Sequence, residues 1–171
     1  MSKALVVIDV QNDYFAGGKL PMWNAEATLE RVEAAVRQAQ ARGVPVVVVQ
    51  HVADAAGGAP FFHRGTAGAE VHPRLRAVAG AAPIVVKAFA DSFVSTTLED
   101  TLDQLGAPEL LICGMMTQNC VTHTAISKSA AKYDVAILPD ACTTVNELLH
   151  QIALHAVSTR VRLVASSAAL A

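Results

Sequence analysis

Short apolar clusters alternate with helix-like stretches along almost the whole chain. Six clusters are rich in valine, isoleucine and leucine, and they cover residues 4–10, 44–50, 83–86, 110–113, 135–138 and 161–164. Runs of this length and composition are typical of strands that are buried on both faces. Six such strands separated by helices predict an α/β fold, in which a parallel sheet lies between two layers of helices with right-handed crossovers.

Capping and turn residues indicate where the first helices begin and end. The apolar spacing over 29–39 predicts a helix that stops at Gly43. A second helix, with leucines at 98, 102 and 105, is expected to begin at Ser95 or Thr96 and to end at Gly106. Both helices connect predicted strands, as a parallel sheet requires.

Similar signals mark the second half of the chain. Thr117 is the expected N-cap of a helix over 117–132, and the Pro139-Asp140 pair is expected to turn the chain. Asn146 can cap a last helix, whose apolar side would carry Leu149, Ile152, Ala153 and Ala156. Residues 51–82 show no clear periodicity, and such a long irregular segment is usually functional. Without a repeat or a linker, residues 1–171 are expected to form a single domain.

Composition and charge exclude several classes of protein. Hydrophobic residues make up 53% of the 171 residues and charged residues only 16%, which excludes a disordered chain. The net charge is −2 and no basic run is present, so we expect neither nucleic acid nor an anionic membrane as a partner. The apolar runs are much shorter than a membrane span.

The N-terminus and the cysteines indicate the compartment. Met-Ser-Lys leads directly into the first strand and has no signal-peptide pattern. The three cysteines form no CxxC motif and no even-numbered disulfide framework. A reducing, cytoplasmic location is therefore expected, in which a free thiolate survives. The high alanine and valine content also hints at a homo-oligomer, a dimer or larger.

Charged residues stand at the ends of two predicted strands. Ligands of parallel sheets bind beyond the carboxyl ends of the strands, near the point where the strand order reverses. Asp9, at the end of the first strand, either caps the following turn or is partly desolvated and acts as a general base. Lys87, at the end of the third, either extends its ammonium into solvent, which its apolar surroundings alone favour, or meets an anion.

Cys120 follows the fourth strand, after Gly114 and a tight turn. In the first turn of a helix, the helix dipole and free N–H groups favour the reactive thiolate, and the same N–H groups can hold an oxyanion. The alternative is a buried cysteine that packs as a small hydrophobic residue. Cys113, within a strand, and Cys142, after the Asp140-Ala141 turn, are interpreted as structural.

Together these motifs resemble the isochorismatase-like cysteine hydrolases, which include nicotinamidases and related amidohydrolases. The resemblance covers nearly the whole chain, and its motifs are Val7 to Phe15, Lys87 with Asp91-Ser92-Phe93, Gly114 to Val121 with Thr124-Ala125, and Asp140-Ala141. It implies a three-layer α/β/α fold with strand order 3-2-1-4-5-6. It also implies a catalytic triad of Asp9, Lys87 and Cys120. Lys87 is then hard to place, because its strand lies two positions from the first, about 9–10 Å away.

The resemblance further implies a non-proline cis peptide at Met115-Met116, which would aim the backbone N–H groups of Met116 and Cys120 at an oxyanion. In the implied mechanism Asp9 takes the thiol proton of Cys120 and Lys87 stabilises the pair. The thiolate attacks a small amide, and water hydrolyses the resulting thioester. Two alternatives remain: an isochorismatase-type hydrolase of vinyl ethers, and a non-catalytic or redox-sensing thiol protein on the same fold.

The sequence departs from the family at the metal site. Nicotinamidases carry an Asp-x-His pair and further histidines that bind a metal, whereas the second strand here ends Val49-Gln50-His51-Val52. His51, His63 and His72 could gather zinc, but their spacing matches no compact ligand signature. We therefore expect neither a metal nor another cofactor.

The expected substrate pocket contains Phe15, Trp23 and Phe62, which follow the first two strands. Phe61 and His63 lie nearby in the sequence. Such aromatic residues either stack on a planar substrate or only pack the loop or a subunit interface. A neighbouring subunit could complete the site through the 51–82 segment.

Overall fold

A computed structural model describes residues 2–53 and 57–171 of the chain. Its centre is a six-stranded sheet with the order β3-β2-β1-β4-β5-β6, in which every neighbouring pair is parallel. The strands are β1 Lys3–Ile8, β2 Val46–His51, β3 Ile84–Lys87, β4 Glu109–Met115, β5 Asp134–Thr143 and β6 Arg162–Leu163. The predicted fold class and strand order are confirmed.

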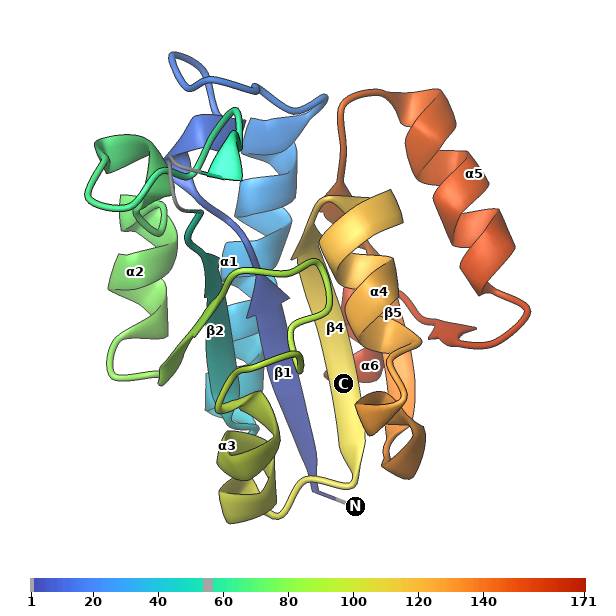
Figure 1. Cartoon of the computed structure of the whole chain (residues 1–171). Coiled ribbons are helices and arrows are strands. Elements are labelled where there is room, and N and C mark those ends of the chain that lie inside the picture. The colour runs from blue at the N-terminus through green and yellow to red at the C-terminus, as the bar shows by residue number, and fades with distance from the viewer. Residues whose placement is uncertain (1, 54–56) are drawn as a thin grey trace.

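Helices cover both faces of this sheet, with α1 behind it and α4 in front of it (Figure 1). The α-helices are α1 Ala25–Ala41, α2 Pro73–Ala79, α3 Leu98–Leu105, α4 Thr122–Ala125, α5 Glu147–Val157 and α6 Ser166–Ala169. The short helices are η1 Asn12–Tyr14, η3 Ala67–Ala69, η4 Thr117–Val121 and η5 Ser129–Lys132, of which η4 is a π-helix. No helix of the described ranges is long and apolar enough to cross a membrane.

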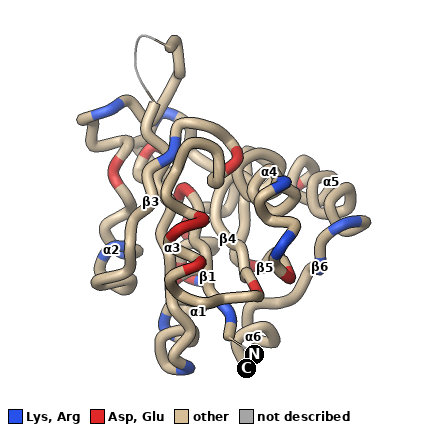
Figure 2. Tube along the Cα trace, turned by 60° about the horizontal axis from the view of Figure 1, so that its bottom comes forward, with Lys and Arg blue, Asp and Glu red and all other residues tan. Residues whose placement is uncertain are grey.

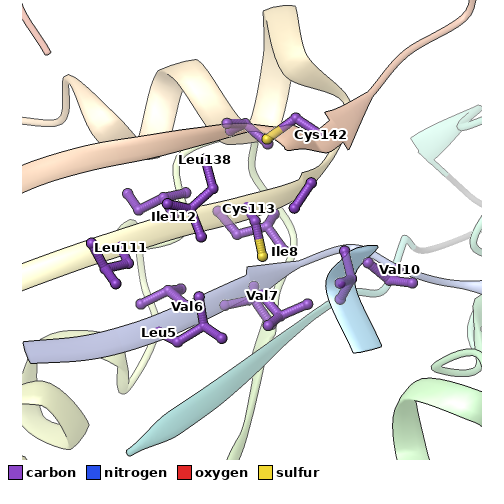
Figure 3. Close-up of a cluster of buried hydrophobic side chains, with 14 of the residues drawn as sticks. Leu5, Val6, Val7, Ile8, Val10, Leu111, Ile112, Cys113, Leu138 and Cys142 are labelled. Atoms are coloured by element: carbon purple, nitrogen blue, oxygen red, sulfur yellow. The ribbon is translucent and has the colours of Figure 1, made fainter. Parts of the chain in front are cut away.

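The core lies around β1, which is flanked by β2 on one side and β4 on the other. Leu5, Val7 and Ile8 have no exposed surface, because helices cover both faces of the sheet. Figure 3 shows the side chains of β1 among those of β4 and β5, with Cys113 and Cys142 in the same cluster. Lys and Arg are interspersed with Asp and Glu around the fold (Figure 2).

Several predicted helix ends are present. Asn146 caps α5 by accepting a hydrogen bond from the Leu149 N–H at 2.9 Å. Gly106 ends α3 in the left-handed conformation, with φ 60°. The N-cap of α3 is Thr97, although the Thr96 hydroxyl accepts the Leu98 N–H at 3.1 Å.

Other sequence-based expectations were wrong. The helix expected over 117–132 is divided into η4, α4 and η5, and its N-cap is Met116 rather than Thr117. The Thr117 hydroxyl instead lies 2.8 Å from His150 Nδ1. Pro139-Asp140 does not turn the chain, because β5 continues through it with a shift of register against β4. The buried side of α5 is formed by His150, Ala153, Leu154 and Val157, whereas Ile152 is exposed.

The segment 51–82 is also more regular than expected, since it contains α2. This helix has only seven residues, so it repeats the helical period too few times to be recognised. A proline begins it and Gly80 follows it, which are the ordinary signals of a helix start and end.

Candidate active site

The sequence-predicted residues Asp9, Lys87 and Cys120 meet at the carboxyl end of the central strands. Asp9 directly follows β1 and adopts a left-handed conformation, with φ 52°. Aspartate and asparagine tolerate this conformation better than other residues with a side chain. Its N–H still donates to the Val49 carbonyl on β2, so the residue is held at the sheet, with no exposed surface.

Lys87, the last residue of β3, crosses the width of β2 to reach this carboxylate. Its Nζ lies 2.8 Å from Asp9 Oδ2, and neither side chain is exposed. It also donates to Cys120 Sγ at 3.2 Å and to the Phe89 carbonyl at 3.0 Å. The long side chain therefore spans the gap that made this residue hard to place from the sequence.

The charges around Lys87 keep it protonated. Burial alone would lower its pKa, but the neighbouring Asp9 carboxylate outweighs burial and raises it. The two oxygens of Asp9 accept no well-formed hydrogen bond from the described residues, apart from the ion pair with Lys87. Oδ1 is thus a buried acceptor with room for a proton.

Cys120 lies in η4 and is only 2% exposed. Burial, and then the charge of Asp9, raise the pKa of its thiol well above the usual value, although Lys87 acts in the opposite direction. The helix start was expected to favour a thiolate. The structure instead favours the protonated thiol, because both the loss of water around the sulfur and the negative charge of Asp9 disfavour the thiolate.

The turn before Cys120 brings β4 very close to β1. The peptide bond between Met115 and Met116 is cis, as the resemblance implied. A Cβ atom on Gly114, which has φ 120°, would lie only 2.0 Å from the Ile8 carbonyl oxygen. Only glycine fits there, and the close approach places η4 directly beside the end of β1 and Asp9.

Hydrogen bonds connect α4, which directly follows η4, to the loop after β3. The Thr124 hydroxyl donates to Ser92 Oγ at 2.8 Å and accepts the Ser92 N–H at 3.0 Å. Asp91 in turn accepts the Phe93 N–H at 2.9 Å. Thr124 follows Cys120 in the sequence and Ser92 follows Lys87. These hydrogen bonds therefore help to fix the position of Cys120 relative to Lys87.

His51 contacts this group of residues, a position that the sequence reasoning missed. It was weighed only as a zinc ligand, yet its Nδ1 lies 2.9 Å from Lys87 Nζ and 3.9 Å from Asp9 Oδ2. The sequence contains a signal for this position, because His51 is the last residue of β2 and ligands of parallel sheets bind beyond the carboxyl ends of the strands.

The histidines considered as zinc ligands, His51, His63 and His72, have separate partners. His72 caps α2 by accepting the Arg74 N–H and packs against Phe15 with the two rings tilted, while His63 Nδ1 lies 3.5 Å from Lys19 Nζ. Within residues 2–53 and 57–171, one group has metal-binding spacing, namely Asp9, His51 and Cys120, with ligand atoms within 4.8 Å of one another. Lys87 Nζ contacts all three, so an ammonium already stands where a metal would bind, and these residues do not fit a resident metal.

The expected pocket residues have different surroundings. Phe15 is 4% exposed and its ring centroid lies 4.3 Å from that of His72. Phe62 is 1% exposed and packs against Tyr14, with its centroid 5.9 Å from His51. Both of these rings are buried, whereas Trp23 is half-buried near His150.

The chain is similar in sequence and fold to known proteins. The family model described as the isochorismatase domain matches residues 3–169. The isochorismatase family protein YddQ of Bacillus subtilis is 36% identical over 144 residues, which cover 84% of this chain and 79% of YddQ. The nicotinamidase of Escherichia coli is 27% identical, with 84% of each chain covered. A putative isochorismatase hydrolase from Oleispira antarctica superposes with a TM-score of 0.86 at 31% identity, covering 99% of this chain and 96% of that one.

Proposed function

Since this chain belongs to the isochorismatase family of hydrolases, we propose that it cleaves an amide-type C–N bond of a small molecule through a thioester on Cys120. The observation that carries the proposal is the contact of three buried side chains with complementary chemistry. Lys87 Nζ lies 2.8 Å from an Asp9 oxygen and 3.2 Å from Cys120 sulfur. A base, a nucleophile and a fixed positive charge therefore share one small volume.

The first half-reaction forms the acyl-enzyme. Asp9 accepts the proton of the Cys120 thiol as the sulfur forms a bond to the amide carbonyl carbon. The raised pKa of this thiol favours a proton transfer that accompanies the attack over a standing thiolate. The charge on the carbonyl oxygen is directed toward the backbone N–H groups of Met116 and Cys120, in the turn that contains the cis peptide.

Collapse of this intermediate breaks the C–N bond. Asp9 returns its proton to the nitrogen, which leaves as ammonia or an amine, and the acyl group remains on sulfur. In the second half-reaction a water molecule attacks the thioester carbonyl carbon and gives a proton to Asp9. The C–S bond then breaks, the carboxylic acid leaves, and the sulfur takes back the proton from Asp9. Lys87 remains protonated throughout and stabilises whichever partner is negative.

The position of Cys120 favours carbonyl chemistry over the cleavage of vinyl ethers. A vinyl-ether hydrolase needs a proton donor and no sulfur nucleophile, whereas here the sulfur contacts the lysine that also binds Asp9. The naming of a relative as a nicotinamidase supports a primary carboxamide as the substrate class.

A panel of small carboxamides that includes nicotinamide, assayed for ammonia release, tests the proposal. Cys120→Ala should lower turnover at least about a thousandfold while the far-UV circular dichroism spectrum stays unchanged. Cys142→Ala is the matched control, because this buried cysteine lies on β5 outside the catalytic group and should be dispensable. Intact-mass measurement should detect an acyl adduct on the wild-type protein. Unchanged ammonia release from the Cys120→Ala protein would exclude the mechanism.

A further inference from the structure

His51 lies at the point where the lysine crosses the sheet. β2 separates β3 from β1, and the register of β2 and β3 pairs His51 directly with Lys87. Register partners on parallel strands project their side chains from the same face. The imidazole is therefore beside the lysine chain, and its Nδ1 lies 2.9 Å from Nζ.

This contact fixes the chemical form of His51. An ammonium group has three N–H donors and no lone pair, so Nδ1 must accept the hydrogen bond. The imidazole is then neutral and its proton is on Nε2. Burial, followed by the positive charge of Lys87, lowers the pKa of His51, which agrees with a neutral ring although Asp9 acts in the opposite direction.

The backbone of His51 is held as firmly as its ring. The Gln11 amide oxygen accepts the His51 N–H, and the Gln11 amide nitrogen donates to the His51 carbonyl, both at 2.8 Å. Gln11 has no exposed surface, and its nitrogen also donates to the Ala69 carbonyl at 2.7 Å. The orientation of the imidazole is thus fixed on both sides, by Gln11 at the backbone and by Lys87 at Nδ1.

The opposite ring nitrogen has no such partner. The His51 side chain is 20% exposed, and its Nε2 has no hydrogen-bond partner in residues 2–53 and 57–171. The side-chain nitrogen and oxygen atoms of the described residues that are both buried and unpaired do not include this Nε2. It therefore reaches solvent. The structure therefore presents one oriented, unpaired N–H donor whose ring lies within 4.8 Å of the Asp9 and Cys120 ligand atoms.

We propose that the Nε2–H of His51 binds a hydrogen-bond acceptor of the substrate, and that Lys87 holds the ring in the tautomer that makes this possible. The inference rests on the proposed amidase function and narrows its substrate class. The substrate is a small amide that carries an acceptor, such as a carbonyl, carboxylate or ring nitrogen, near the scissile carboxamide. A site built around such a donor discriminates strongly against analogues without the acceptor.

Two substitutions separate the roles of the two ring nitrogens. In His51→Asn the side-chain oxygen can replace Nδ1 as the acceptor for Lys87, but no atom reaches the position of Nε2. We expect KM to rise at least tenfold and kcat to change less than threefold. In His51→Gln an N–H can reach the Nε2 position while the Lys87 contact is lost, so kcat should fall and KM should change little. His155→Asn, on the exposed side of α5, is the matched control.

Nuclear magnetic resonance of protein labelled with 15N-histidine tests the tautomer without turnover. At neutral pH His51 should show the long-range 1H–15N pattern of the Nε2–H tautomer. In the Cys120→Ala protein, addition of nicotinamide should shift the Nε2 resonance of His51 and leave that of His155 unchanged.

The outcomes separate this inference from the proposed function. If the wild-type protein released ammonia from none of the amides, the amidase function would be contradicted. The NMR measurement would still test the tautomer of His51, because it does not depend on turnover. An Nδ1–H tautomer or an imidazolium at neutral pH would overturn the inference. An unchanged KM in His51→Asn would also overturn it. So would the same fall in kcat and the same rise in KM in both variants, which is the result expected of a merely structural role.

Discussion

The buried ion pair between Asp9 and Lys87 should show strong energetic coupling. Asp9→Asn removes the negative charge and keeps a residue that tolerates the left-handed backbone at φ 52°. Lys87→Met removes the positive charge and keeps an unbranched chain. Each single variant leaves one charge buried without its partner, because both side chains are fully buried. Breaking such a pair costs about 3–5 kcal/mol of unfolding free energy. The lower end applies to Asp9→Asn, since the Lys87 ammonium still donates to His51 and to the Phe89 carbonyl.

The double variant has no buried charge left in the pair. Replacement of both partners by neutral groups is often nearly neutral, so we expect a cost of about 2 kcal/mol rather than the roughly 6–8 kcal/mol of two independent effects. The coupling energy is therefore about 4–6 kcal/mol. Urea unfolding followed by circular dichroism at about pH 7.5, under reducing conditions because all three cysteines are free, measures each free energy.

An exposed pair of the same residue types is the control for this cycle. Lys132 Nζ lies 3.0 Å from Asp103 Oδ1, but the two side chains are 44% and 57% exposed. Solvent screens this pair, so Lys132→Met and Asp103→Asn should be additive. A coupling below about 0.5 kcal/mol between Asp9 and Lys87 would refute the conclusion that the two form an ion pair shielded from solvent.

Two further predictions concern stability. Gly114→Ala should lower the unfolding free energy by about 3–5 kcal/mol and reduce ammonia release. The reason is that the new Cβ would overlap the Ile8 carbonyl oxygen, at a backbone φ of 120°. A urea midpoint equal to that of wild type would contradict this prediction. Acidification should also destabilise the protein, since burial lowers the pKa values of His51, His72 and His150. The unfolded chain binds protons first, so this stability is present above about pH 6.5 and is lost as the pH falls below it. The urea midpoint should be lower at about pH 5 than at about pH 7.5, and the difference should shrink in His150→Gln.

The regular parts of the fold could be predicted because they depend on local composition. β1 and β2 contain apolar runs rich in β-branched residues, and the burial of these runs on both faces follows directly from that pattern. Periodicity failed where packing between distant segments decides the conformation. The segment 117–132 is an example, since it begins as the π-helix η4, continues as α4 to Ala125 and is interrupted before η5.

Asp9, Lys87 and Cys120 could be selected from the sequence, whereas their neighbour His51 was missed and the chemical state of the group could not be predicted. The apolar neighbours of Lys87 alone favoured an ammonium in solvent, yet it is buried on a carboxylate that is 78 positions away in the sequence. The helix start alone favoured a thiolate at Cys120, yet burial raises the pKa of this thiol. Both outcomes depend on solvent exclusion by the assembled sheet, which no local pattern contains.

The arrangement around Lys87 explains how one cation can serve both ends of the proposed proton transfer. Four acceptors lie within 3.2 Å of Nζ, namely Asp9 Oδ2, His51 Nδ1, the Phe89 carbonyl and Cys120 Sγ. An ammonium has only three N–H groups, so one acceptor always lacks a full hydrogen bond. As the thiol proton moves to Asp9 during the attack, the carboxylate loses its negative charge and part of that charge develops on the sulfur, so one N–H can turn from Asp9 to Sγ. His51 and Phe89 hold the other two N–H groups during this exchange. The positive charge thus follows the negative one by rotation of a single ammonium, with no movement of the backbone.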